Sequence, residues 1–256
     1  RITEPGLQVL KSIDLILREV NNLRRIGQQY SAQNHGTLSI ATTHTQARYV
    51  LPKPVSRLRA AYPDVTVSLH QGSPDQVARM VIEEVAEIGM ATESLANYPE
   101  LVTLPCYEWQ HVLVMPREHP LASAKQIGLA RLAEHPLVTY HPSFTGRSRI
   151  DLAFEKQGLK PRIALEAIDS DVIKTYVGLG MGIGIVAEMA VRDGLPDTLV
   201  SRPAGALFGS NMARVAFKKG SYLRHFVLEF AQMLSERLNR ELVLKALEGR
   251  STDYEL

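Results

Sequence analysis

The sequence is poor in cysteine, with Cys106 as the single one in 256 residues. Cys106 therefore cannot form a disulfide within the chain, and a zinc site built from several cysteines is excluded. A lone cysteine fits a reducing compartment, so we expect a cytoplasmic protein. The thiol is a candidate nucleophile, but Pro105 before it and Trp109 soon after it favour a thiol packed in a core.

Long apolar segments are also missing. The longest runs, 112–115 and 183–187, are far shorter than the roughly 18 apolar residues that span a bilayer. The first residues do not form a charged stretch followed by an apolar block, so no signal peptide is indicated. We therefore expect no association with a membrane, and a secreted solute receptor of the transport type is disfavoured.

Neither sign of charge dominates. The chain has 29 basic and 27 acidic residues, a net charge of +2. Basic residues are spread out except at Arg24 and Arg25 and at Lys218 and Lys219. Compact nucleic-acid-binding domains usually carry a basic patch, so this sequence does not resemble a DNA-binding domain.

A long amphipathic helix is predicted at the start of the chain. Apolar residues from Leu7 to Ile26 form one stripe, and polar residues such as Lys11 and Asp14 lie outside it. The pattern continues to Tyr30, and a helix of about 24 residues spans roughly 36 Å. Because this exceeds what a small core needs, we expect it to pack along another helix, for instance one of a second chain.

After Gly36 the pattern alternates between strand and helix, which predicts parallel sheets with helices on their faces. The chain contains two such series of strands and helices, which predicts two α/β units. The first series predicts strands over 38–41, 64–72 and 87–93 and helices over 46–51, 55–62 and 74–85. The second predicts strands over 101–109, 111–117, 136–140, 161–168 and 182–188 and helices over 126–133, 148–156 and 169–179. The chain then ends with a strand over 212–220, a helix over 223–237 and a last helix through Leu247.

Small polar side chains gather at the ends of three predicted strands. In open α/β sheets, ligands bind outside the carboxyl ends of strands. Two of the three groups belong to the first unit and one to the second, so facing units would place them on opposite walls of one cleft. The groups are Thr42, Thr43, Thr45 and Gln46, then Thr92, Glu93 and Ser94, then Ser143, Thr145, Gly146 and Ser148.

A threonine at a strand-to-helix junction can cap the helix or turn its hydroxyl toward an anion. Capping is the usual role for one such residue. Thr42, Thr43, Thr45 and Gln46 together are more than one helix needs.

A glycine-rich segment has the residue spacing of a dinucleotide-binding fingerprint but not its structural context. Gly182, Gly184 and Ala187 have the required spacing, but the fingerprint must follow a strand and open a helix. Here a helical pattern precedes the glycines and a strand-like run follows them. We therefore predict a helix end, a tight turn and a new strand.

No catalytic centre is evident either. The eight histidines do not cluster, and His44 has no evident partner for catalysis, so we interpret it as packed or supporting and expect no metal site. Glu83 and Glu84 are consecutive on a predicted helix, which indicates solvated surface. The alternative that we keep is a small α/β transferase or hydrolase for an anionic substrate, using Thr43, His44 or Cys106.

Several segments, taken together and in order, resemble the effector-binding half of LysR-type transcriptional regulators. The resemblance extends from about Thr3 to Arg237. The segments are TLSIATTHTQARYVLP, HQGSP, REHPLA, HPLVTY, FTGRS, DSDVIKTYV and GLGMGIGIV. ATTHTQARY, FTGRS and DVIKTYV resemble specifically the branch of the family that regulates cysteine and sulfur metabolism.

The resemblance implies an α/β fold with two Rossmann-like subdomains and a ligand cleft between them, as in type II periplasmic binding proteins. It places the remainder of a linker and dimerisation helix at 1–35. Subdomain I is expected over 36–106 plus 210–237, subdomain II over 107–209, and a surface helix with a tail over 238–256. It also implies an N-terminal helix-turn-helix domain ahead of this chain.

The resemblance further implies a role in transcription rather than catalysis. The cleft would bind a small anionic effector: sulfate, thiosulfate, N-acetylserine or O-acetylserine, with no cofactor. Its partners would be DNA through the helix-turn-helix, RNA polymerase in the full-length regulator, and further copies in a homodimer or homotetramer. The contacts carried over to the effector are Thr43, Thr45, Gln46, Thr92 and Thr145.

These side chains suit sulfate for a physical reason. Sulfate is doubly charged at physiological pH, so hydroxyl, amide and backbone N–H donors can hold it without a buried counter-charge. Threonine hydroxyls can also accept a hydrogen bond, so protonated phosphate stays open as a ligand.

Overall fold

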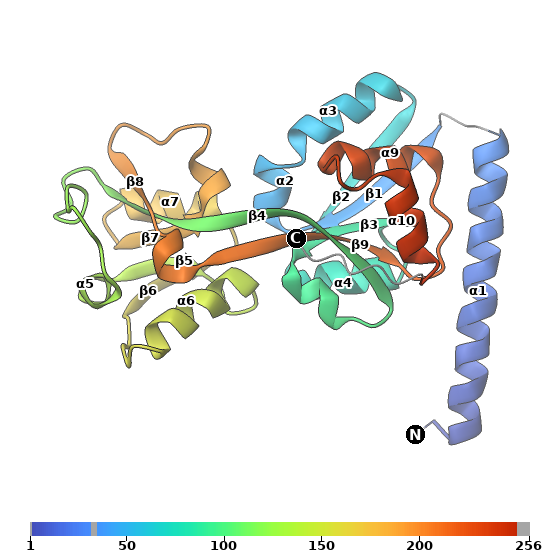
Figure 1. Cartoon of the computed structure of the whole chain (residues 1–256), viewed down its shortest axis with the longest axis horizontal. Helices are drawn as coiled ribbons and strands as arrows, with labels where there is room; N and C mark the ends of the chain where they lie inside the picture. The colour runs from blue at the N-terminus through green and yellow to red at the C-terminus, as the bar shows by residue number, and fades with distance from the viewer. Residues whose placement is uncertain (1, 32–34, 250–256) are drawn as a thin grey trace.

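A computed structural model describes residues 2–31 and 35–249 of the chain. The first part is helix α1 (Glu4–Ser31), which runs along one side of the remainder, as Figure 1 shows. The rest forms two lobes that lie side by side and are joined by two long strands. Among the described residues, no helix is both long and apolar enough to cross a membrane.

The first lobe is built on three parallel strands. They are β1 (Gly36–Thr42), β2 (Val65–Gln71) and β3 (Ile88–Thr92). The helices of this lobe are α2 (His44–Tyr49), α3 (Pro52–Ala61), α4 (Pro74–Ile82), α9 (His225–Leu234) and α10 (Arg240–Leu247). A short 3₁₀ helix, η1 (Glu93–Asn97), follows β3.

The second lobe repeats this arrangement with other strands. β5 (Leu137–Tyr140) pairs in parallel with β6 (Ile163–Ala167) and β7 (Ile183–Ala187). β8 (Leu199–Pro203) joins through β4. Its helices are α5 (Leu129–Ala133), α6 (Thr145–Glu155), α7 (Ser170–Gly178) and α8 (Gly205–Phe208), and the 3₁₀ helix η2 (Glu188–Val191) follows β7.

Two antiparallel strands connect the lobes (Figure 1). β4 (Leu101–Pro116) pairs with β9 (Ser210–Lys218) in the first lobe and with β7 and β8 in the second. The strand order is β2-β1-β3-β9-β4-β7-β5-β6. Two strands were predicted over 101–109 and 111–117, which is wrong because β4 continues through both ranges and changes partners near Gln110. The predicted subdomain boundaries at 106/107 and 209/210 stay a prediction.

Each lobe has its own apolar core. Leu38, Ile88 and Phe230 are fully buried in the first core. Leu137, Phe154 and Ile185 are fully buried in the second. A small cluster of Trp109, Ala187, Met189 and Ala213 packs where the connecting strands cross from one lobe to the other.

Two further predictions are corrected. The last helix was expected on the surface, but Val243 and Ala246 of α10 are buried against the first core. Glu84 was expected on a helix in solvent, but α4 ends at Ile82 and only 13% of the Glu84 side chain is exposed, because Arg25 and Lys218 pair with it. The helix end, turn and new strand predicted around Gly182 are confirmed, since α7 ends at Gly178 and β7 begins at Ile183.

Candidate functional site

A small cavity lies between the two lobes. All five residues predicted to bind an effector line it, and they come from both lobes. Thr43 precedes α2, Thr45 and Gln46 lie in its first turn, Thr92 ends β3, and Thr145 begins α6. The remaining lining residues are Trp109, Tyr140, Phe144, Gly146, Ala187 and Met189.

The threonine hydroxyls are not used as helix caps. Thr43 is the N-cap residue of α2 and Thr92 that of η1, yet neither side chain makes a capping hydrogen bond. Thr145 follows the N-cap residue Phe144 and is already helical. The capping interpretation therefore does not account for these three hydroxyl groups.

Two of the hydroxyls meet across the cavity. Thr92 Oγ1 of the first lobe lies 2.5 Å from Thr145 Oγ1 of the second, although 53 residues separate them in sequence. Ser94 Oγ lies 3.3 Å from Thr92 Oγ1 and 3.2 Å from Thr145 Oγ1. Hydroxyls that satisfy one another in this way can rotate to donate to a ligand oxygen.

Gln46 is oriented by a neighbouring tyrosine. The Tyr107 hydroxyl donates a hydrogen bond to Gln46 Oε1. This bond occupies the amide oxygen and leaves the Gln46 NH₂ group as a donor. Gln46 is only 3% exposed, so its orientation is fixed by packing as well.

A second tyrosine supports the first strand-to-helix junction from the other lobe. The Ala187 N–H donates to the Tyr140 hydroxyl at 2.8 Å, and Ser170 Oγ lies 2.6 Å from that hydroxyl. Ser170 Oγ in turn lies 3.4 Å from Thr45 Oγ1. Burial raises the pKa of the Tyr140 hydroxyl, so it stays protonated.

The cavity is polar but not charged. No Asp, Glu, Lys or Arg is among the described residues that line it. The donors are hydroxyl groups and the Gln46 amide, while Trp109, Phe144 and Met189 supply apolar walls. This combination can hold an anionic group together with a small apolar portion of a ligand.

Beneath the cavity lies a buried and neutral histidine. His111 is 0% exposed, and burial together with the charge of Arg149 lowers its pKa from 6.5 to about 3. Its ring packs edge to face on Trp109. Trp109 Nε1 and His111 Nε2 are both buried without a hydrogen-bond partner among the described residues.

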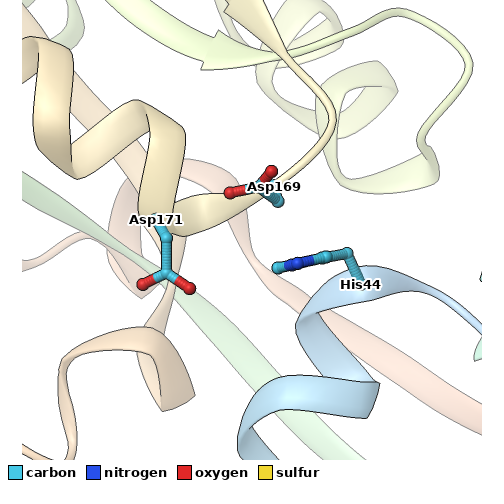
Figure 2. A group of neighbouring side chains, drawn as sticks. All are labelled: His44, Asp169 and Asp171. Atoms are coloured by element: carbon cyan, nitrogen blue, oxygen red, sulfur yellow. The ribbon is translucent and has the colours of Figure 1, made fainter.

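The side chains considered for catalysis do not form a catalytic site. Cys106 lies in the first core with Sγ 3.8 Å from the Leu234 carbonyl oxygen, and burial raises the pKa of its thiol to about 12. His44 lies beside Asp169 and Asp171 at the edge of the cleft, as Figure 2 shows. A protonated thiol in a core is a poor nucleophile.

Sequence reasoning included some residues that the cavity does not use and missed others. Ser143 and Ser148 are exposed and do not line it. Glu93 instead pairs with Arg149 of the other lobe at 2.6 Å. Ala187 and Met189 were missed, although Ala187 ends β7, Met189 lies two residues later and the strand-end rule covers both. Trp109 was missed because it lies inside β4, where no rule of position marks a ligand contact.

Comparisons with known proteins identify the family to which this chain is related. Residues 31–239 match the family model described as the LysR substrate binding domain. The chain is 49% identical over 255 residues to the HTH-type transcriptional regulator CysB of Burkholderia cenocepacia, covering all of this chain and 82% of that protein. It is 45% identical over 238 residues to the regulator SsuR of the same organism, covering 93% of this chain and 77% of that protein.

A solved structure is similar throughout the two lobes. The cofactor-binding domain of the Cbl transcriptional regulator is 41% identical, with a TM-score of 0.79, and the match covers 83% of this chain and 93% of that one. The predicted resemblance to the cysteine and sulfur branch is confirmed by these matches. The predicted fold class, an α/β fold like that of type II periplasmic binding proteins, is confirmed as well.

Proposed function

Since this chain belongs to the LysR family of transcriptional regulators, we propose that it senses an effector for a regulator of sulfur assimilation and cysteine biosynthesis. Two relatives that it matches over most of its length, CysB and SsuR, are named transcriptional regulators and not enzymes. The effector that we propose is sulfate or an N-acetylserine-like compound, with thiosulfate and O-acetylserine as further members of the same class. Such a regulator acts on DNA in the cytoplasm.

The proposal of an anionic ligand is based on one observation. Neutral donors from both lobes converge on one cavity, and the hydroxyls of Thr92 and Thr145 already touch across it. An anion that never takes up a proton needs donors only, and these residues supply them without a buried cation. The apolar walls formed by Trp109, Phe144 and Met189 suit the acetyl and methylene groups of an acetylserine.

Further partners of the full-length regulator are proposed because of its family membership. A helix-turn-helix ahead of residue 1 would bind DNA, and the full-length regulator would contact RNA polymerase. Helix α1 supports association into a homodimer or homotetramer, because its apolar side chains are exposed; Leu15, Ile16 and Leu23 are 51%, 63% and 68% exposed.

Calorimetry with sulfate and with N-acetylserine tests the site. Each hydroxyl that donates to a charged oxygen contributes about 1.5–3 kcal/mol, or about tenfold to a hundredfold in affinity. Thr92→Val and Thr145→Val should each weaken binding by such a factor. Thr66→Val is the matched control, since Thr66 is exposed on β2 and far from the cavity lining.

Thermal unfolding separates a ligand contact from a structural role. A variant that has lost a ligand contact keeps the melting temperature of the free protein and loses the extra stability that ligand gives. Unchanged affinity in both variants, together with lower melting temperatures without ligand, would contradict the proposed site. Phosphate is titrated in parallel, and equal affinity for phosphate would remove the argument for an unprotonated anion.

A further inference from the structure

A histidine and two aspartates from different lobes lie together at the edge of the cleft. His44 begins α2 in the first lobe, while Asp169 is the N-cap residue of α7 and Asp171 lies in its first turn. Figure 2 shows the His44 ring extending toward the two carboxylates. One nitrogen or oxygen atom from each residue lies within 4.8 Å of the others.

The His44 ring has an unsatisfied polar atom. Nδ1 of His44 is buried and has no hydrogen-bond partner among the described residues. Buried polar atoms are nearly always paired, so an unpaired one calls for an explanation. A ligand bound at this nitrogen would supply that explanation.

Asp169 is held in place with one oxygen to spare. Its Oδ1 accepts a hydrogen bond from the Val172 N–H at 2.8 Å, which fixes the carboxylate at the start of α7. The residue is 8% exposed. Its other oxygen has no partner in the part of the chain that the structure describes, so it is available to a cation.

Asp171 has one strongly held and one weakly held oxygen. Its Oδ1 accepts from the Tyr49 hydroxyl and lies 3.1 Å from Lys174 Nζ. Its Oδ2 faces only Arg48 Nε at 3.6 Å, and the Arg48 side chain is 62% exposed. Because exposed ion pairs contribute little to stability, Oδ2 can turn from Arg48 to a metal ion.

We propose that His44, Asp169 and Asp171 bind a divalent transition-metal ion of the Zn²⁺ class, with water completing its coordination. One imidazole nitrogen and two carboxylate oxygens suit Zn²⁺, whereas Mg²⁺ and Ca²⁺ prefer oxygen ligands alone. Metal-to-ligand distances of about 2.0–2.2 Å require the three atoms to approach one another slightly. Small rotations of the three side chains or a small closing movement of the lobes provide this approach.

Such an ion would link the two lobes beside the effector cavity. His44 lies between Thr43 and Thr45, and Asp169 precedes Ser170, which contacts Thr45. Metal binding would therefore favour the arrangement of lobes that the effector also contacts, and each ligand would raise the affinity for the other. The metal site itself does not depend on which effector occupies the cavity.

Calorimetric titration of ZnCl₂ into the chain, in a buffer that does not chelate, tests the proposal. We expect one ion per chain with micromolar or tighter affinity, and no heat with Mg²⁺. His44→Ala and Asp171→Asn should each weaken binding by at least tenfold. The Asp171 side chain is 41% exposed, so its replacement leaves both cores intact, and circular dichroism of the metal-free variants confirms folding.

Matched controls come from two other histidine sites. His35 lies 3.8 Å from Asp64 as an exposed pair without a third ligand, so His35→Ala should bind Zn²⁺ like the parent chain. The rings of His119 and His135 lie 4.7 Å apart, so His119→Ala tests binding there. Absence of Zn²⁺ binding by the parent chain, unchanged affinity in the Asp171→Asn variant, or loss of binding in His119→Ala would each overturn the proposal.

Discussion

At the scale of single residues, the cavity depends on side chains that stay uncharged. The five neutral donors, the protonated Tyr140 hydroxyl and the neutral His111 ring surround or underlie it. A charge on any of them would alter the affinity for an anion by a through-space interaction in a region of low dielectric. The neutrality of His111 has a consequence for stability that can be measured.

We expect the chain to lose stability as the pH falls below about 6.5, the ordinary pKa of histidine. The folded protein keeps His111 neutral down to a pKa of about 3, whereas the unfolded chain takes up that proton near pH 6.5. The unfolded state therefore binds more protons between these values, and acid favours unfolding. For one such histidine the loss between pH 7 and pH 5 is about 2 kcal/mol.

Urea unfolding of the parent chain and of His111→Gln at pH 7 and pH 5 isolates this effect. The glutamine amide does not titrate, so the variant should lose about 2 kcal/mol less over the same interval. Contributions of the other histidines are present in both proteins and cancel in the comparison. Equal losses would show that His111 takes up a proton in the folded state.

Residue positions were predictable from the sequence where a rule of topology applied. Thr43, Thr92 and Thr145 all lie at strand ends or helix starts, and the strand-end rule predicts that they share one cleft. His111 and Asp169 could not be found in this way, because the neutral state of His111 depends on its burial and the environment of Asp169 on its approach to His44. That His44 meets two carboxylates more than 120 residues away is likewise a property of the folded chain alone.

At the scale of elements, the sequence predicted the limits of helices and strands better than it predicted the pairing of strands. The periodic pattern marked β1, α4 and α7 because each carries one buried face. It divided β4 in two because that strand exchanges β9 for β7 along its length, and its burial pattern changes there. It missed β8, whose five residues are too few to show a period.

Within the described residues, the polar contacts of helix α1 with the first lobe come from its later turns. Asn22 Nδ2 donates to the Gly220 carbonyl oxygen at 3.0 Å, and Asn22 Oδ1 accepts from the Tyr222 N–H at 2.8 Å. Arg25 Nη2 lies 3.1 Å from Glu84 Oε2. Glu84 keeps a φ of +59° for this contact, a conformation that is unusual for a residue other than glycine. Apolar side chains of α1 from Leu7 to Leu23 stay exposed.

We predict that the apolar stripe of α1 mediates self-association. Ile16→Glu together with Leu23→Glu places two charges on exposed apolar positions and should lower the mass seen by analytical ultracentrifugation. Lys11→Glu changes the charge of the helix by the same kind of substitution outside the stripe, and we expect no change of mass. An unchanged assembly in the double variant would place the interface on the lobes instead.

At the scale of the whole molecule, side chains of the two lobes make polar contacts both in the cavity and beside it. Arg149 pairs with Glu93 at 2.6 Å, and Lys174 Nζ donates to the Tyr49 hydroxyl at 2.9 Å. Thr92 and Thr145 add the contact across the cavity itself. Because the cavity and the lobe contacts share one surface, a ligand that binds one arrangement better shifts the population of lobe arrangements.

The charge of the whole molecule leads to the last prediction, which concerns DNA. Binding to duplex DNA at physiological salt depends largely on basic residues that displace counterions, and the 29 basic residues are nearly balanced by 27 acidic ones. Several of the basic side chains are already paired, as Arg25 and Lys218 are with Glu84. We therefore expect residues 1–256 to show no change in fluorescence anisotropy of a labelled duplex up to about 10 µM protein at physiological salt.

A fusion protein serves as the control for the DNA-binding experiment. The match to CysB of Burkholderia cenocepacia covers 82% of that protein, which leaves a part of it unmatched. Placing the helix-turn-helix domain of that relative ahead of residue 1 should produce binding that falls steeply with added salt, as phosphate contacts require. Tight and sequence-specific binding by residues 1–256 alone would contradict the prediction, because a recognition surface would then have to lie on the lobes or on α1.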